Sequence, residues 1–179
     1  FGIKSISIGS LISRDTPIIW RGVKISGALE QLMTQTNWGE IDVMVIDMPP
    51  GTGDIQITLS QRAEMDGVVI VSTPQDIALI DAIKGVNMFK KTDTPILGII
   101  ENMSCFICPC CGARSDIFGH NGAKQTAEKM GETFLGEIPL DMAIRQNADK
   151  GTPIVVSAPN SPYSQAYLDI AKKIIQRIG

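Results

Sequence analysis

The sequence predicts an α/β protein with a doubly wound, mostly parallel sheet, built as a single domain over residues 1–179. Two observations predict this class. Short apolar runs alternate with amphipathic helical segments along nearly the whole chain, and most of these runs lack the polar alternation of a half-exposed strand. The composition agrees, because 44% hydrophobic and 20% charged residues in a chain of 179 are enough to bury one core.

The predicted strands are of two kinds. Residues 5–11 alternate apolar and polar side chains with the period of two that a strand requires. The runs Val-Met-Val-Ile, Val-Val-Ile-Val and Ile-Leu-Gly-Ile-Ile are apolar throughout, which is typical of parallel strands covered on both faces. In chain order, we expect strands at residues 5–11, 43–46, 68–71, 96–100 and 133–136, and an extended segment at 153–156.

The predicted helices carry their apolar residues at helical spacing. Ile25, Leu29 and Leu32 fall on one face of the first helix, and Ile170 and Ile174 fall on one face of the last. Alternation of such helices with the strands favours a sheet with helices on both faces. We expect helices at residues 24–36, 55–63, 77–90, 122–130 and 161–178.

Charge and hydropathy exclude two classes of partner. The net charge of −3 argues against a nucleic-acid partner held through phosphate contacts. No stretch approaches the roughly 18 consecutive apolar residues of a membrane helix, so we expect no membrane partner. The chain begins with Phe1 rather than Met, which indicates a processed product or the carboxyl-terminal portion of a longer protein, incomplete at its N-terminus.

An acidic residue, a proline pair and glycines follow the apolar run at residues 43–46. Ligands in open α/β sheets bind beyond the carboxyl ends of the strands, where Asp47 is expected. Its carboxylate can hold Mg²⁺, and Gly51 and Gly53 let backbone N–H groups approach a phosphate closely. Asp54 is expected to cap the following helix. The alternative is a strand-to-helix loop in which Asp47 only caps and the prolines only stiffen.

All four cysteines lie within seven residues, which fits a reducing compartment and metal or redox chemistry better than a disulfide scaffold. Cys108 and Cys111 have the C-x-x-C spacing that lets two thiolates reach one metal centre, so residues 104–119 are predicted to form a metal-binding loop. Two chains related by a two-fold axis would supply four thiolates. A zinc site and a thiol–disulfide pair remain alternatives. Cys105 is interpreted as structural, and the role of Cys110 is open.

Asn102 follows the predicted strand at residues 96–100. Its amide offers both a donor and an acceptor, the combination that recognises the edge of an adenine ring. A turn or helix cap is an equally good interpretation of this residue from the sequence alone.

Several collinear motifs together resemble the Mrp/NBP35 family of P-loop ATPases, which carry iron–sulfur clusters. Asp-Met-Pro-Pro-Gly-Thr-Gly-Asp at residues 47–54 is similar to the switch II segment of that family. Essentially the whole chain shares the resemblance. The other matching segments are Pro-Ile-Ile-Trp-Arg-Gly at 17–22, Thr-Pro-Gln-Asp at 73–76, Glu-Asn-Met-Ser at 101–104, Cys-Pro-Cys-Cys-Gly at 108–112, Ile-Phe-Gly at 117–119 and Gly-Glu-Ile-Pro-Leu-Asp at 136–141.

The resemblance implies a P-loop NTPase architecture of the MinD/ParA type with a deviant Walker A loop. It implies a [4Fe–4S] cluster bridging a homodimer through Cys108 and Cys111 and passed to recipient apoproteins, with ATP and Mg²⁺ regulating the carrier. Asp47 would organise Mg²⁺ and water, as the catalytic residue. Gly51 and Gly53 would sense the γ-phosphate, and Asn102 would touch adenine. A cytoplasmic location follows from the reduced cysteines and the family.

The chain departs from the family pattern at Cys105, Cys110 and the Walker A loop, and the last of these matters most for function. It contains no Gly-rich loop ending in Lys-Ser or Lys-Thr, so we expect the phosphate cradle to lie outside these residues and ATP hydrolysis by this chain alone to be doubtful. Two other functions stay open at this point. One is a ParA/MinD-like positioning ATPase, which does not need the cysteines, and the other is a zinc-stapled interaction module without catalysis.

Overall fold

The computed structural model describes residues 1–7, 22–48, 53–63 and 65–179. The chain divides into two compact units, Phe1–Ala63 and Glu64–Gly179. The larger unit contains every described strand, and the described residues of the smaller unit contain two helices. The prediction that residues 1–179 form one domain stays a prediction.

In the first unit, helices α1 (Gly22–Thr34) and α2 (Asp54–Arg62) contact each other. The segment after α1 is held locally, since the indole Nε1 of Trp38 donates to the Met33 carbonyl at 3.2 Å and the Lys4 ammonium donates to the Trp38 carbonyl.

The strand predicted at residues 43–46 is not present among the described residues. A strand is stabilised by backbone hydrogen bonds to a neighbouring strand, and all the described strand pairs lie in the second unit. The apolar side chains here are correspondingly open, with Val43 53% and Val45 88% exposed. Residues 5–7 of the other early prediction are also not in a strand, and residues 8–11 lie outside the described part of the chain.

The second unit is built on a four-stranded sheet whose centre is β2 (Ile96–Ile107). Strands β1 (Val68–Ser72) and β4 (Phe134–Leu140) both pair with β2 in parallel, and the short β3 (Arg114–Ser115) pairs antiparallel with the end of β2. The predicted mostly parallel sheet is therefore confirmed.

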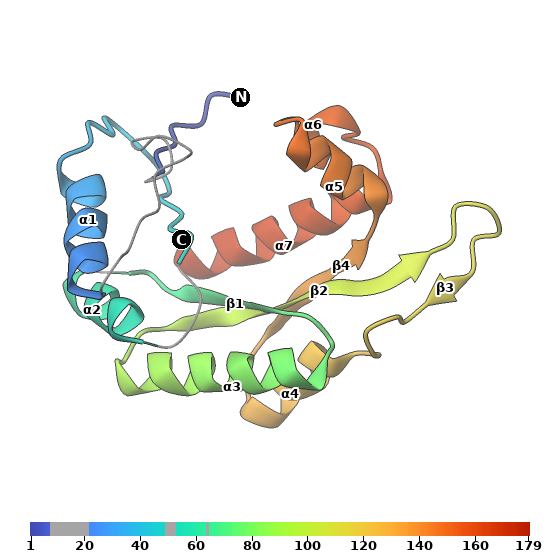
Figure 1. The fold of residues 1–179 in the computed structure, drawn as a ribbon, viewed down its shortest axis with the longest axis horizontal. Helices are drawn as coiled ribbons and strands as arrows, with labels where there is room; N and C mark the ends of the chain where they lie inside the picture. Colours follow the sequence, from blue (N-terminus) through green and yellow to red (C-terminus); the bar gives the residue numbers. More distant parts are fainter. Residues whose placement is uncertain (8–21, 49–52, 64) are drawn as a thin grey trace. The chain divides into compact units, whose positions relative to one another are not determined.

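Helices cover both faces of this sheet (Figure 1). On one face, α3 (Asp76–Lys91) and α4 (Gly122–Met130) contact the strands, and on the other α7 (Pro162–Ile178) packs along β4. The side chains of successive residues of β2 point to opposite faces of the sheet. Ile99 packs with Val86 and Ala127 under α3 and α4, whereas Ile100 joins the core beneath α7. This explains the lack of polar alternation in the sequence of β2.

The chain between β4 and α7 forms two short helices. Asp141 caps α5 (Met142–Asp149) by accepting the Ala143 N–H at 2.6 Å. The extended segment predicted at residues 153–156 is instead a single helical turn, α6 (Ile154–Ser157). The carbonyl of Pro153 accepts the N–H groups of Val156 and Ser157 at 2.9 and 3.0 Å, which closes the turn despite its β-branched residues.

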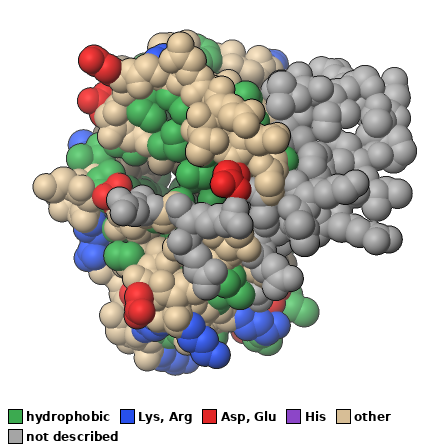
Figure 2. Space-filling view, turned by 90° about the vertical axis from the view of Figure 1, so that its left-hand side faces the viewer, with side chains coloured by type: hydrophobic (Ala, Val, Ile, Leu, Met, Phe, Trp, Pro, Cys, Tyr) green, Lys and Arg blue, Asp and Glu red, His purple; other side chains and the backbone are tan. Residues whose placement is uncertain are grey.

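The helix cap predicted at Asp54 is wrong by one residue. The N-cap of α2 is Gly53, and Asp54 is the first helical residue; likewise Gln75 precedes α3 and Asp76 opens it. The carboxylate of Asp76 still lies in the first turn, where it interacts favourably with the helix dipole. No described helix is both long and apolar enough to cross a membrane. On the face seen in Figure 2, the described acidic and basic side chains lie among apolar ones.

Candidate functional site

The cysteine loop, defined here as residues 108–113, forms the tip of the hairpin between β2 and β3. Figure 1 shows this hairpin extending away from the helices that flank the sheet. The Cys108 N–H donates to the Ala113 carbonyl at 2.9 Å, and the Gly112 N–H donates back to the Cys108 carbonyl at 2.8 Å. Gly112 adopts a φ of 71°, a left-handed conformation that glycine accepts without a steric penalty. The loop therefore folds Cys111 back over Cys108.

The local backbone favours the thiolate form of Cys108. The backbone N–H of Cys111, and next that of Cys110, hydrogen-bond to this sulfur and lower the pKa of the Cys108 thiol below its ordinary value. A thiolate is the form of cysteine that can bind a metal or act as a nucleophile. Cys110 and Cys111 are exposed, and all four cysteines are free thiols.

Cys105 lies apart from these thiols. It is 3% exposed on β2, and its sulfur lies 3.9 Å from the Ser104 hydroxyl, which is also buried. Its interpretation as a structural residue agrees with this burial.

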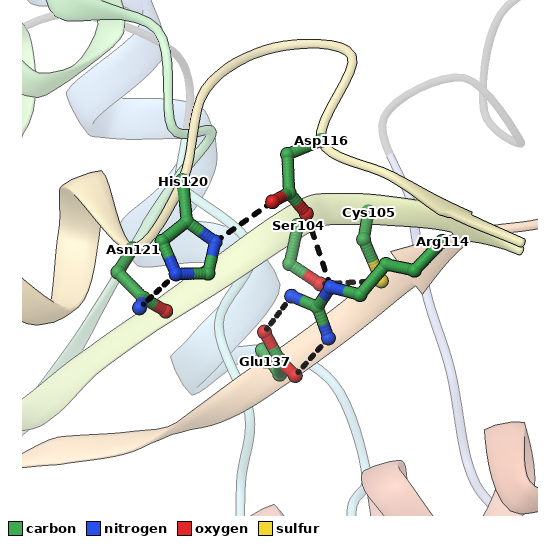
Figure 3. Close-up of polar contacts among 7 residues, drawn as sticks. All are labelled: Ser104, Cys105, Arg114, Asp116, His120, Asn121 and Glu137. Atoms are coloured by element: carbon green, nitrogen blue, oxygen red, sulfur yellow. Dashed lines mark hydrogen bonds and ion pairs between the residues drawn. The ribbon is translucent and has the colours of Figure 1, made fainter.

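A polar network surrounds the base of the hairpin (Figure 3). Arg114, the first residue of β3, reaches Glu137 on β4 with Nη1–Oε1 and Nη2–Oε2 distances of 3.4 and 3.5 Å. Its Nε donates to Asp116 at 3.0 Å. Asp116 in turn lies 2.9 Å from Nδ1 of His120, whose Nε2 lies 2.7 Å from the Asn121 amide. The carboxylates of Glu137 and Asp116 raise the pKa of the guanidinium above its ordinary value.

Asn102 lies at an irregularity of β2. Its Oδ1 accepts the N–H of Met103 at 3.0 Å, and Met103 has a positive φ of 56°. The pairing with β4 shifts register between Asn102 and Phe106. The Oδ1 acceptor of Asn102 is thus used by the next residue inside β2, which continues to Ile107, so Asn102 does not follow the end of its strand as predicted. The predicted contact with adenine stays a prediction.

Glu101 is a buried carboxyl group that sequence reasoning did not single out. It is 1% exposed, and Oε2 accepts the Ala123 N–H of α4 at 2.7 Å. Burial raises the pKa of this carboxyl above its ordinary value, although the hydrogen bond from Ala123 opposes the shift. The carboxyl thereby ties the centre of the sheet to the start of α4.

The remaining predicted site residues belong to the first unit. Asp47 is exposed in the segment before α2, and Gly53 is exposed at the N-cap of that helix. Gly51 lies outside the described residues. Cys108 and Cys111 share one loop and Asn102 lies earlier on the same hairpin strand, whereas Asp47 and Gly53 lie in the other unit. Within the described part of the chain, no group of three or more His, Cys, Asp or Glu side chains is arranged to hold a metal ion.

Comparison with known proteins assigns the chain to a family. A family model described as "ParA: NUBPL iron-transfer P-loop NTPase" matches residues 1–175. The chain belongs to this family. The resemblance to the Mrp/NBP35 ATPases predicted from the motifs is confirmed, since this chain is 54% identical over 178 residues to the "Iron-sulfur cluster transfer protein NUBPL" of Dictyostelium discoideum. It is 48% identical over 177 residues to the "Iron-sulfur cluster carrier protein" of Escherichia coli strain K12.

Solved structures confirm the P-loop NTPase architecture. A nucleotide-binding protein of Archaeoglobus fulgidus in complex with ADP is 38% identical, with a TM-score of 0.67 over 79% of this chain and 57% of that one. The septum site-determining protein MinD of Pyrococcus horikoshii complexed with Mg-ADP shares the fold with a TM-score of 0.64 at 23% identity, over 89% of this chain and 58% of that one.

The alignment covers almost all of this chain but only part of its relatives. It takes in 99% of this chain against 55% of the Dictyostelium protein, and 99% against 48% of the Escherichia coli protein. The chain thus spans about half the length of the curated relatives that it matches.

Proposed function

We propose that this chain belongs to an iron–sulfur cluster carrier that binds a [4Fe–4S] cluster between two copies of itself and transfers it to recipient apoproteins. The observation that carries the proposal is the cysteine loop. It presents two thiols with C-x-x-C spacing at an exposed hairpin tip, and backbone N–H groups stabilise the thiolate of Cys108. Hydrogen bonds of this kind to a ligating sulfur also tune the reduction potential of a bound cluster.

Cys108 and Cys111 are the proposed cluster ligands. A [4Fe–4S] cluster requires four ligands, and a two-fold axis beside the loop supplies four thiolates from two chains. Both thiols lie at the tip of a hairpin rather than in the core, so they are accessible to a partner. A cluster held at such a tip is also accessible to a recipient apoprotein, as a transfer reaction requires.

Nucleotide enters the proposal through the other residues predicted from the motifs. Asp47 would hold Mg²⁺, whose hard character suits an exposed carboxylate. Gly51 and Gly53 would follow the γ-phosphate, and Asn102 would use its free Nδ2 donors on adenine because Oδ1 accepts from Met103. ATP binding and hydrolysis are proposed for the full-length protein, with Asp47 as the catalytic residue.

The proposed location is a reducing compartment, the cytoplasm. Four free thiols within seven residues agree with it. The Arabidopsis thaliana relative, 51% identical over 176 residues, is described as a mitochondrial iron–sulfur protein required for NADH dehydrogenase.

The test is anaerobic reconstitution of the chain with iron and sulfide, followed by the visible spectrum and the iron and zinc content. We expect charge-transfer absorption that is lost in Cys108→Ala and in Cys111→Ala. Cys110→Ala is the matched control, since it removes a thiol from the same loop without altering the backbone N–H groups that contact Cys108. Stoichiometric zinc without cluster absorption, or an undiminished cluster in Cys108→Ala, contradicts the proposal.

A further inference from the structure

The hairpin that carries the cysteine loop has few backbone connections to the rest of the sheet. Its return strand β3 contributes two residue pairs, Phe106 with Ser115 and Ile107 with Arg114. Arg114 directly follows the cysteine loop, and the carbonyl of the preceding Ala113 accepts the N–H of Cys108. Whatever holds Arg114 therefore determines where the cysteine loop points.

The Arg114 side chain is held on two sides. Its fork of Nη1 and Nη2 meets both oxygens of Glu137 at 3.4 and 3.5 Å, and its Nε meets Asp116 at 3.0 Å (Figure 3). Glu137 lies on β4 and pairs in register with Glu101 of β2. A planar guanidinium whose three nitrogens all contact carboxylates is held in one orientation relative to those carboxylates. The ammonium group of a lysine, which acts as a point charge, would not be held in this way.

Asp116 extends the restraint to a second element. It lies 2.9 Å from His120, which contacts Asn121, the N-cap residue of α4. The chain turns tightly against the segment after β1 at this place, because a Cβ added to Gly122 would lie 2.6 Å from the carbonyl oxygen of Pro74. Arg114 thus connects the hairpin both to β4 and to a closely packed helix start.

Exposure argues that these contacts serve orientation rather than overall stability. The Arg114 and Glu137 side chains are 43% and 38% exposed, and ion pairs as exposed as this contribute little to the stability of a fold. Their bidentate geometry still restricts direction. A hairpin tip that presents metal ligands must hold them in a fixed orientation, since a cluster dissociates faster from thiolates on a mobile loop.

We infer that Arg114 is a positioning residue, which acts through Glu137 and Asp116 to hold Cys108 and Cys111 in one orientation and so slows loss of the bound cluster. This inference rests on the proposed function. In this role the fork geometry of Arg114 is required, and its positive charge alone is not sufficient. The role therefore differs from electrostatic stabilisation of an anionic cluster.

The first test uses the chain without cluster and measures amide hydrogen exchange at Cys108 and Gly112. In Arg114→Gln we expect both amides to exchange roughly tenfold faster, while the midpoint of global unfolding stays close to that of the parent. Arg145→Gln is the matched control, because Arg145 forms a 2.7 Å pair with Asp149 on α5 and has no contact with the hairpin among the interactions described. Unchanged exchange in Arg114→Gln overturns the inference.

The second test measures the half-time of cluster loss to a chelator after reconstitution. We expect about a tenfold shorter half-time in Arg114→Gln, and the double variant with Glu137→Gln should be no faster than Arg114→Gln alone, because the two residues act as one contact. Arg114→Lys keeps the charge but not the fork, and we expect it to behave like Arg114→Gln. Full rescue by lysine, or additive effects of the two substitutions, overturns the inference.

The two proposals fail in different ways. If Cys108→Ala retains the cluster, the carrier proposal fails whatever Arg114 does, and the exchange measurement on the cluster-free chain still tests the orientation of the loop. If the cysteines are required but Arg114→Gln matches Arg145→Gln in both measurements, only the positioning inference fails.

Discussion

Gly98 on β2 is the position where a single methyl group should damage the fold most directly. It has a φ of 149°, and a Cβ built there would lie 2.6 Å from the carbonyl oxygen of Thr133 and 2.7 Å from Cγ of Leu135. The contact with Thr133 involves a backbone atom, so rotation of a side chain cannot relieve it. Leu135 is fully buried in the core beneath α7 and has little room to move.

The cost of Gly98→Ala has two parts. Overpacking a close-packed core costs about 1–3 kcal/mol, and a non-glycine residue at positive φ costs about 1–2 kcal/mol. We therefore expect Gly98→Ala to lower the free energy of unfolding by roughly 2–5 kcal/mol, less a few tenths from the smaller entropy of the unfolded chain.

Gly131→Ala is the matched control for this substitution. Gly131 ends α4 with a φ of 71°, and an added Cβ meets nothing within 4 Å. The control also places alanine at a positive φ and has the same unfolded-state effect but no steric clash, so the excess cost of Gly98→Ala measures the clash together with the greater strain of alanine at a φ of 149°. Urea denaturation of both variants measures it. A Gly98→Ala variant within about 0.5 kcal/mol of Gly131→Ala would refute the reasoning, because the clash alone should exceed 1 kcal/mol.

Three further predictions follow from the second unit. Because burial raises the pKa of Glu101, the folded state holds the carboxyl proton more tightly than the unfolded chain does, so the free energy of unfolding should fall as pH rises from the ordinary value of 4.5 through the raised pKa. Urea denaturation at several pH values measures this dependence. Glu101→Gln should weaken it, and an unchanged dependence on pH would contradict the prediction. Ser164→Ala removes a fully buried hydroxyl whose single O–H is shared between the Ile154 and Ala158 carbonyls, and the substitution should cost about 1–3 kcal/mol in the same assay. Gly112→Ala strains the left-handed turn behind Cys111 by about 1–2 kcal/mol and should speed cluster loss to a chelator, whereas an unchanged half-time would show that the turn is not needed.

The sequence was sufficient for the parallel strands of the second unit and for the helices α3, α4 and α7, because their core is built from local pattern, but it did not predict β3, α5 or the helical turn α6. Ile99 and Ile100 are both apolar because helices cover both faces of β2, and that burial is visible in the sequence as a run without alternation. The run at residues 43–46 carries the same pattern but is not a strand among the described residues. Apolar character indicates that a segment can be buried between helices, whereas strand formation also requires a hydrogen-bonded neighbour.

The site was predictable only where its residues are close in the sequence. The C-x-x-C spacing of Cys108 and Cys111 marks one loop, and the structure gives that loop its hydrogen bonds. The contact between Arg114 and Glu137 joins residues 23 apart, on strands that no local pattern pairs. Glu101 was visible only as part of a family motif, since nothing in the sequence marks a carboxyl group that will be buried against a helix N-terminus.

Native mass spectrometry of the anaerobically reconstituted chain tests the central claim most directly, because it reports the number of chains and the metal in one measurement. The account predicts a dimer that carries one [4Fe–4S] cluster, and a cluster-free chain for Cys108→Ala prepared in the same way. A monomer that holds its own cluster, or one that holds zinc through the same cysteines, would contradict it.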